Sequence, residues 1–123
     1  MAIQPELMAR GLAVTKKLWG ERAGGGELPA QKLAPEFFAL VVQSCFGMFW
    51  SRPELDLRSR SLCTVAQLAA LGRTDELKAH LAGALNLGIK RGELIEVLMQ
   101  TSCYAGVPAA VAALNAAAEI LKP

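Results

Sequence analysis

The chain has 123 residues, a hydrophobic content of 53% and a mean hydropathy of +0.31. This length fits one domain, 1–123, that can bury a core without the help of disulfides or metals. The formal net charge of +2 is too small to indicate a nucleic-acid partner or an anionic membrane surface. The slight apolar excess is typical of a chain whose surface is partly covered by further copies, so we expect an oligomer.

The cysteines Cys45, Cys63 and Cys103 form no CxxC motif and lack the spacing of metal ligands. Each lies in an apolar run, which predicts buried, inert and reduced thiols. Reduced thiols are typical of the cytoplasm, and the N-terminal stretch has no pattern of an export signal. Glycine and proline interrupt the longest uncharged run, so no membrane span of about 20 residues is expected. We therefore predict a cytoplasmic protein.

Apolar periodicity, together with proline and glycine at the breaks, predicts an all-α domain of about six helices. The glycine run at 24–26 predicts a flexible connector rather than a phosphate-binding loop, because no strand precedes it and no Walker lysine follows. Thr74 is the expected N-cap of the fourth helix. In chain order the expected helices cover 5–19, 35–50, 57–71, 75–86, 90–104 and 109–121.

Residues 57–88 are expected to form the centre of the domain, as two helices joined by a turn at Gly72. The first helix is apolar on nearly every side beyond Arg60, which predicts burial all round. The second carries His80, the only histidine, on the apolar face that includes Leu77 and Leu81. An inward titratable group is a candidate for chemistry; the alternative is a hydrogen-bonded core histidine. No second histidine stands at metal spacing, so no metal site is expected.

Arg52, Arg58 and Arg60 are candidates for binding carboxylates, because the planar guanidinium group matches a carboxylate with two parallel hydrogen bonds. The alternative is that they are solvated helix-end residues paired with neighbours such as Glu54. Tyr104 is expected to be a buried phenol with one hydrogen bond.

Several motifs, in this order along the chain, resemble the carboxymuconolactone decarboxylase family of the alkylhydroperoxidase-like superfamily. The likeness covers nearly the whole chain and implies an alkylhydroperoxidase-like helical bundle that assembles into trimers or hexamers. The segments that carry it are Arg10-Gly11, Pro35-Glu36-Phe37, Trp50-Ser51-Arg52-Pro53, Leu55 to Leu62, Ala69 to Arg73, Glu76-Leu77, His80, Ala84 to Gly88 and Tyr104 to Ala110.

The resemblance also implies a reaction. The type enzyme of the family removes carbon dioxide from 4-carboxymuconolactone in aromatic catabolism, giving the enol-lactone of 3-oxoadipate, and it uses no cofactor. Carbon dioxide loss leaves electron density on a conjugated lactone, so an acid must protonate carbon and cations must steady the anionic groups. The residues implied for these tasks are His80 as proton donor or relay, and for substrate binding Arg52, Arg58, Arg60, Trp50 and Tyr104.

The thiol peroxidase branch of the superfamily places a glutamate, a CxxC pair and a histidine along the same two helices. Counted back from His80, the glutamate falls at Ser61 and the two cysteines fall at Arg73 and Glu76. Peroxide reduction by that mechanism is therefore not expected, because both thiols are replaced.

Two further positions differ from the decarboxylase pattern. Met48 stands where a glutamate is common, and Ala82 stands where an arginine is common. Both changes alter the charge of the expected pocket. The alternatives to the type activity are therefore a paralogue that acts on a different lactone or unsaturated acid, and a non-catalytic helical oligomer.

Overall fold

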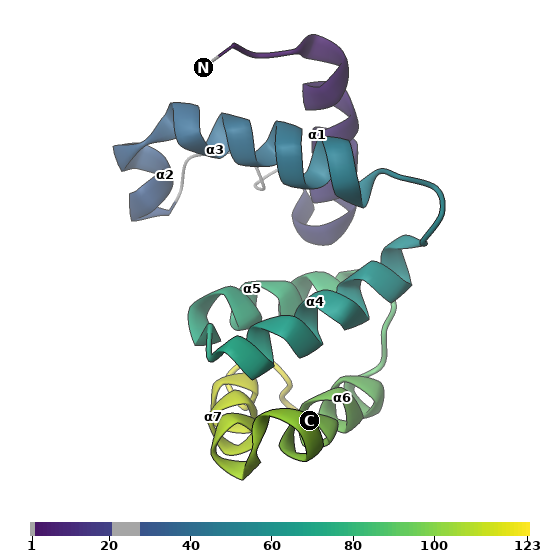
Figure 1. Ribbon diagram of the computed structural model, residues 1–123, viewed down its shortest axis with the longest axis vertical. Coiled ribbons are helices and arrows are strands. Elements are labelled where there is room, and N and C mark those ends of the chain that lie inside the picture. The colour runs from purple at the N-terminus through teal and green to yellow at the C-terminus, as the bar shows by residue number, and fades with distance from the viewer. Residues whose placement is uncertain (1, 21–27) are drawn as a thin grey trace. The chain divides into compact units, whose positions relative to one another are not determined.

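The computed structural model describes residues 2–20 and 28–123, and these residues form helices and connecting turns without strands. The predicted all-α fold class is therefore confirmed (Figure 1). The described chain divides into two compact units, Met1–Leu57 and Arg58–Pro123. The glycine connector predicted at 24–26 lies outside the described residues, and the single domain stays a prediction. No helix in the described ranges is long and apolar enough to cross a membrane.

In the first unit, α1 (Pro5–Trp19) has the bounds that the sequence predicts. Pro5 suits the first turn because its fixed φ is helical and its missing N–H would have no intrahelical partner there. Gly20 ends the helix with a φ of 75°, a conformation that costs glycine little. The side chain of the buried Gln43 accepts a hydrogen bond of 2.5 Å from the Gln4 N–H, which satisfies a donor at the start of α1.

The helix expected over 35–50 is present, but it changes type along its length. It starts as α3 (Pro35–Val41) and continues without a break as the π-helix η2 (Val42–Trp50). The wider winding is visible in the Ser51 N–H, which donates to the Phe46 carbonyl at 3.1 Å. Apolar periodicity predicts the helix but cannot separate these two windings. The five-residue α2 (Pro29–Leu33) was not expected, because it is too short to show a period.

The first unit is held together where α1 crosses η2 (Figure 1). Two glycines make this crossing close. A Cβ atom added to Gly11 would overlap the Val42 carbonyl oxygen, and one added to Gly47 would overlap the Leu7 carbonyl oxygen. An edge-to-face contact between the Trp19 ring and a neighbouring phenyl ring, with centroids 5.7 Å apart, lies at the same crossing.

The second unit is a bundle of α4 (Leu57–Leu71), α5 (Thr74–Asn86), α6 (Arg91–Ala105) and α7 (Val107–Ala117) (Figure 1). Each helix contributes an apolar stripe to one core, whose burial is the main source of stability for a bundle of this size. The core residues are Val65, Ala69, Leu77, Leu81, Ala84, Ile89, Leu94, Leu98, Ala113, Ala117 and Leu121.

The turns of the second unit follow from glycine. Gly72 has a φ of 72° and lets the chain reverse between α4 and α5. The expectation that Thr74 caps α5 is wrong: Thr74 is already helical, and Arg73 occupies the cap position without a side-chain cap hydrogen bond. At the start of α6 the Glu93 carboxylate accepts a hydrogen bond of 2.9 Å from the Lys90 N–H, which caps that helix.

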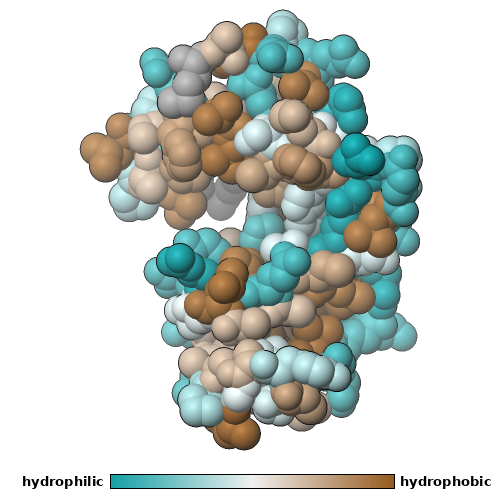
Figure 2. Space-filling model, viewed as in Figure 1, coloured by the Kyte–Doolittle hydropathy of each residue, from teal (hydrophilic) through white to brown (hydrophobic). Residues whose placement is uncertain are grey.

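The expectation of an α4 buried on all sides is wrong. Only Ser61, Val65 and Ala69 are buried along α4, whereas Leu71 is 71% exposed. This spacing of four places a single stripe on the core, and the opposite side of the helix faces outward. Hydrophobic residues are accordingly visible on the surface of both units (Figure 2).

The expected burial of the thiols and of the phenol is also wrong. All three cysteines are exposed, because each follows a buried residue by two positions and so points to the other side of its helix. Tyr104 is 89% exposed, since the core is formed further back along α6 by Leu94 and Leu98. The cysteines and the buried residues before them are Cys45 after Gln43, Cys63 after Ser61, and Cys103 after Thr101.

Candidate functional site

His80 lies on α5 beside the core of the second unit. Leu77 and Leu81, one turn before it and the residue after it, are fully buried, and His80 itself is half-buried. The inward position predicted from helical periodicity is therefore confirmed.

Burial lowers the pKa of His80 from 6.5 to about 4, because removing the imidazolium ion from water disfavours the charged form. At pH 7 the side chain is thus neutral, with about one molecule in a thousand protonated. A neutral imidazole can accept a proton at one nitrogen and donate a hydrogen bond from the other. An anion bound beside it would raise the pKa again, because a negative charge favours imidazolium.

The lowered pKa of His80 predicts a specific loss of stability in acid. Between pH 6.5 and about 4 the unfolded chain binds the proton and the folded chain does not, so stability is complete above pH 6.5 and falls towards pH 4. We expect wild type to lose about 2–3 kcal/mol more than His80→Leu between pH 7.5 and 4.5. Urea unfolding of both proteins at the two pH values measures this, and equal losses would contradict the proposed cause.

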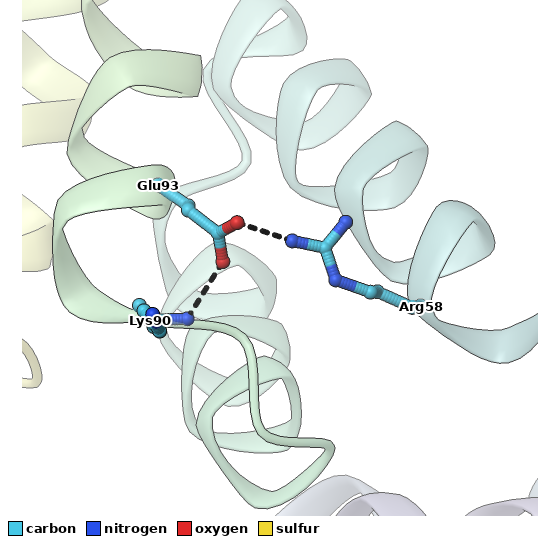
Figure 3. Close-up of polar contacts among 3 residues, drawn as sticks. All are labelled: Arg58, Lys90 and Glu93. Atoms are coloured by element: carbon cyan, nitrogen blue, oxygen red, sulfur yellow. Dashed lines mark hydrogen bonds and ion pairs between the residues drawn. The ribbon is translucent and has the colours of Figure 1, made fainter.

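Arg58, at the start of α4, forms an ion pair with Glu93 of α6 (Figure 3). The Lys90 N–H and the Arg58 guanidinium both hold the pKa of Glu93 below its ordinary value, the N–H having the larger effect. The carboxylate is therefore shared between a helix cap and an ion pair. This contact differs from the predicted alternative, in which Arg58 pairs with a neighbour in sequence such as Glu54.

Arg60, the second arginine of α4, is half-buried. Residues two apart on a helix lie on different sides, so Arg60 starts from another face of α4 than Arg58. The two predicted carboxylate-binding arginines of this helix do not form one cluster.

Trp50 and Arg52 line a pocket of about 460 Å³ in the first unit. This volume is within the range of small-molecule sites. Arg52 Nη2 lies 4.0 Å from Glu54 Oε2, which is the ion pair that the alternative interpretation predicts. The Arg52 side chain is 58% exposed. The structure thus brings together two of the residues predicted to bind substrate. The complete lining is Arg10, Ala13, Val14, Lys17, Trp50, Ser51, Arg52, Pro53, Leu55, Asp56 and Leu57.

Sequence reasoning missed two cations of this pocket, Arg10 and Lys17. Both lie on α1, two helical turns apart and therefore on one face. That spacing was the available signal. This spacing on α1 alone does not predict a pocket, because the opposite wall is formed by residues 50–57, about forty positions further along the chain.

Tyr104 lines a separate hollow of about 430 Å³ in the second unit, between α4 and α6. The walls are mostly apolar, with Leu62, Ala66 and Val97 among them, and His80 is not part of the lining. The structure therefore does not group Tyr104 with His80.

Comparison with known proteins adds to this geometry. The family model described as the carboxymuconolactone decarboxylase family matches residues 35–119. A protein of Acinetobacter baylyi named 4-carboxymuconolactone decarboxylase is 39% identical over 114 residues, which cover 92% of this chain and 85% of that protein. The nitrosuccinic acid decarboxylase of Metarhizium robertsii is 32% identical over 75 residues, covering 61% of this chain and 52% of that protein.

A third relative is a 15.0 kDa protein of Paracoccus denitrificans, uncharacterized by its name. It is 30% identical over 92 residues, which cover 73% of this chain and 69% of that protein. The family match at 35–119 contains α3 to α7 and with them every residue predicted to bind substrate or to transfer a proton, but it leaves α1 out.

Proposed function

Because this chain belongs to the carboxymuconolactone decarboxylase family, we propose that it is a cofactor-free carboxy-lyase of aromatic catabolism. The proposed reaction converts 4-carboxymuconolactone to the enol-lactone of 3-oxoadipate and carbon dioxide. The observation that carries the proposal is the relative of that name, which matches this chain over most of both lengths. The half-buried His80 supports it, because the reaction needs one proton transfer in a site shielded from water.

The proposed reaction needs no oxidant and no external electron source. The carbon–carbon bond to the departing carboxylate breaks, and its electron pair passes into the unsaturated lactone. One proton then adds to a ring carbon, which gives the enol-lactone and leaves carbon dioxide as the second product. The protein has to steady the delocalised anion and to deliver that proton.

We assign the proton transfer to His80. Its pKa of about 4 leaves it neutral before substrate binds. The negative charge of a substrate held beside it would raise that pKa, so the imidazole takes up a proton as the anion arrives and returns it to carbon. The negative charge of the bound substrate thus prepares the proton that is needed once carbon dioxide has left.

Arg52, Arg58 and Arg60 are proposed to bind carboxylates, with Trp50 and Tyr104 as walls of the pocket. The geometry favours Arg52 and Trp50, because they line one pocket that also contains other cations. Arg58 is the weaker candidate, since the Glu93 carboxylate already occupies its guanidinium. Binding at Arg58 would require a substrate carboxylate to displace that ion pair.

A turnover assay tests the proposed function. Purified full-length chain, treated with a metal chelator, is incubated with 4-carboxymuconolactone while the lactone acid and the enol-lactone are followed by absorbance. We expect enol-lactone in amounts equal to the acid consumed. If the acid persists under conditions where the protein stays folded, the type activity is wrong for this chain.

A second candidate function is decarboxylation of a related acid, and two observations favour it. Met48 and Ala82 replace a glutamate and an arginine of the family pattern, and a relative is named for decarboxylating nitrosuccinic acid. Nitrosuccinate is also a carboxylate whose carbanion would be delocalised, in that case into a nitro group. Turnover of nitrosuccinate without turnover of 4-carboxymuconolactone would select this second function.

The homo-oligomer, as a trimer or hexamer, and the cytoplasmic location are further parts of this proposal. The exposed apolar residues of both units, such as Phe49 and Val107, support the oligomer, because such surface is usually covered. Sedimentation of the full-length chain would give the number of subunits.

A further inference from the structure

We propose that the pocket of the first unit binds the carboxylate that the substrate keeps, with Arg10 as its main ligand and Lys17 as a second cation. Ser51 is the residue that positions Arg10. The choice of an organic acid rests on the decarboxylase function proposed above. Neither Arg10 nor Lys17 lies within the residues that the family model matches, 35–119.

The lining of this pocket is positively charged. Arg10, Lys17 and Arg52 contribute three cations, and Asp56 contributes the one carboxylate. Within the described parts of the chain, neither Arg10 nor Lys17 is held in an ion pair. Both cations are therefore available to an anion that enters the pocket, and the indole of Trp50 offers an apolar wall to the rest of a small ligand.

Arg10 is held in place before a ligand arrives. The Ser51 hydroxyl donates to the Gly47 carbonyl at 2.5 Å, so its oxygen is free to accept, and Arg10 donates to it from Nη2 at 2.8 Å. The hydrogen bond to Ser51 uses one N–H of the guanidinium group and leaves other N–H donors for a carboxylate. A side chain positioned in advance loses less entropy on binding.

The chemistry decides which carboxylate belongs there. A cation paired with the departing carboxylate would stabilise the ground state and would be lost as neutral carbon dioxide forms, which raises the barrier. A cation paired with a retained carboxylate holds substrate, transition state and product alike. A cationic pocket therefore suits the carboxylate that remains in the enol-lactone.

The test uses muconolactone, which is the proposed substrate without the departing carboxylate. Calorimetric titration should show binding to wild type and a roughly ten- to hundredfold weaker affinity for Arg10→Gln and Lys17→Gln. With 4-carboxymuconolactone, both variants should raise KM by a similar factor and change kcat by less than about threefold. The charge-matched controls Arg73→Gln and Lys32→Gln, both exposed, should behave as wild type.

The outcomes separate this proposal from the proposed function. If muconolactone binding depends on Arg10 but 4-carboxymuconolactone is not turned over, the proposed pocket is supported and the proposed decarboxylase activity is wrong. Turnover with KM and muconolactone affinity unchanged in Arg10→Gln would overturn the pocket alone. Inorganic phosphate that binds as tightly as muconolactone, or a methyl ester of muconolactone that binds equally well, would also overturn the assignment to an organic carboxylate.

The positioning role of Ser51 has its own signature. Ser51→Ala should raise KM several-fold with little change in kcat, and Ser51→Thr, which keeps the hydroxyl, should restore it. The double variant with Arg10→Gln should be no worse than Arg10→Gln alone, because both changes remove one interaction. Additive losses of affinity would overturn the positioning role.

Discussion

His80→Ala is expected to lower kcat for 4-carboxymuconolactone by about a hundredfold to ten-thousandfold, the usual contribution of a positioned acid–base group. The loss should appear mainly in kcat, because the imidazole returns its proton to carbon in the chemical step, after the substrate has bound. Steady-state kinetics on the purified full-length chain measures it. If His80→Ala keeps the activity of wild type, the role assigned to His80 is wrong.

A packing role for His80 is separated from a chemical role by His80→Leu. Leucine fills a half-buried position beside Leu77 and Leu81 and removes the burial of a polar ring, so the helical circular dichroism and the stability at neutral pH should be retained. We expect this variant to be as inactive as His80→Ala. Free imidazole added to His80→Ala should restore part of the rate, which a loss of packing would not allow.

Gly47→Ala is expected to destabilise the first unit by about 1–3 kcal/mol, because the new methyl group would overlap the Leu7 carbonyl oxygen and force α1 away from η2. Alanine normally favours a helix by about 1 kcal/mol over glycine, so a net loss would show that the crossing determines the residue. Urea unfolding measures the difference.

Gly92→Ala is the matched control for this change. Gly92 lies in the first turn of α6 with nothing within 4 Å of an added Cβ and without a positive φ. Its replacement should leave stability unchanged or raise it by up to about 1 kcal/mol. Equal losses at Gly47 and Gly92 would contradict the close crossing.

The helices could be predicted from sequence where proline or glycine marks their ends. These residues act through local backbone geometry, so the helix ends can be predicted without knowledge of the fold. They are Pro5, Gly20, Pro35 and Gly72. The π-winding of η2 and the short α2 could not be predicted in this way. The nine residues of η2 are too few to separate the wider period of a π-helix from that of an α-helix, and the five residues of α2 are too few to show any period.

Burial was less predictable than helix position. Leu77 and Leu81 flank His80 on a face that periodicity identifies correctly. The exposed cysteines and Tyr104 were expected inside because apolar neighbours in sequence share a helix without sharing its face. Which faces are covered depends on how helices pack, and that information is spread over the whole chain.

The candidate site was predictable only in part, for the same reason. His80 and the arginines could be chosen as candidates from the chemistry of their side chains alone. Of the predicted substrate-binding residues, Trp50 and Arg52 line one pocket. Arg10 lines the same pocket from α1, and its hydrogen bond to Ser51 joins residues 41 positions apart, which no local sequence pattern predicts. The ion pair between Arg58 and Glu93 joins α4 to α6, and it could not be predicted because the two residues lie far apart in the sequence.

The reaction proposed for this chain removes carbon dioxide from a lactone acid and returns one proton to carbon without a cofactor. Its most direct test is nuclear magnetic resonance of the reaction in heavy water, with 4-carboxymuconolactone labelled with carbon-13 in the departing carboxylate. With chelator-treated protein we expect one equivalent of labelled carbon dioxide and one deuterium on a ring carbon of the enol-lactone. Labelled carbon that stays in the organic product, or a rate no faster than without protein, would contradict it.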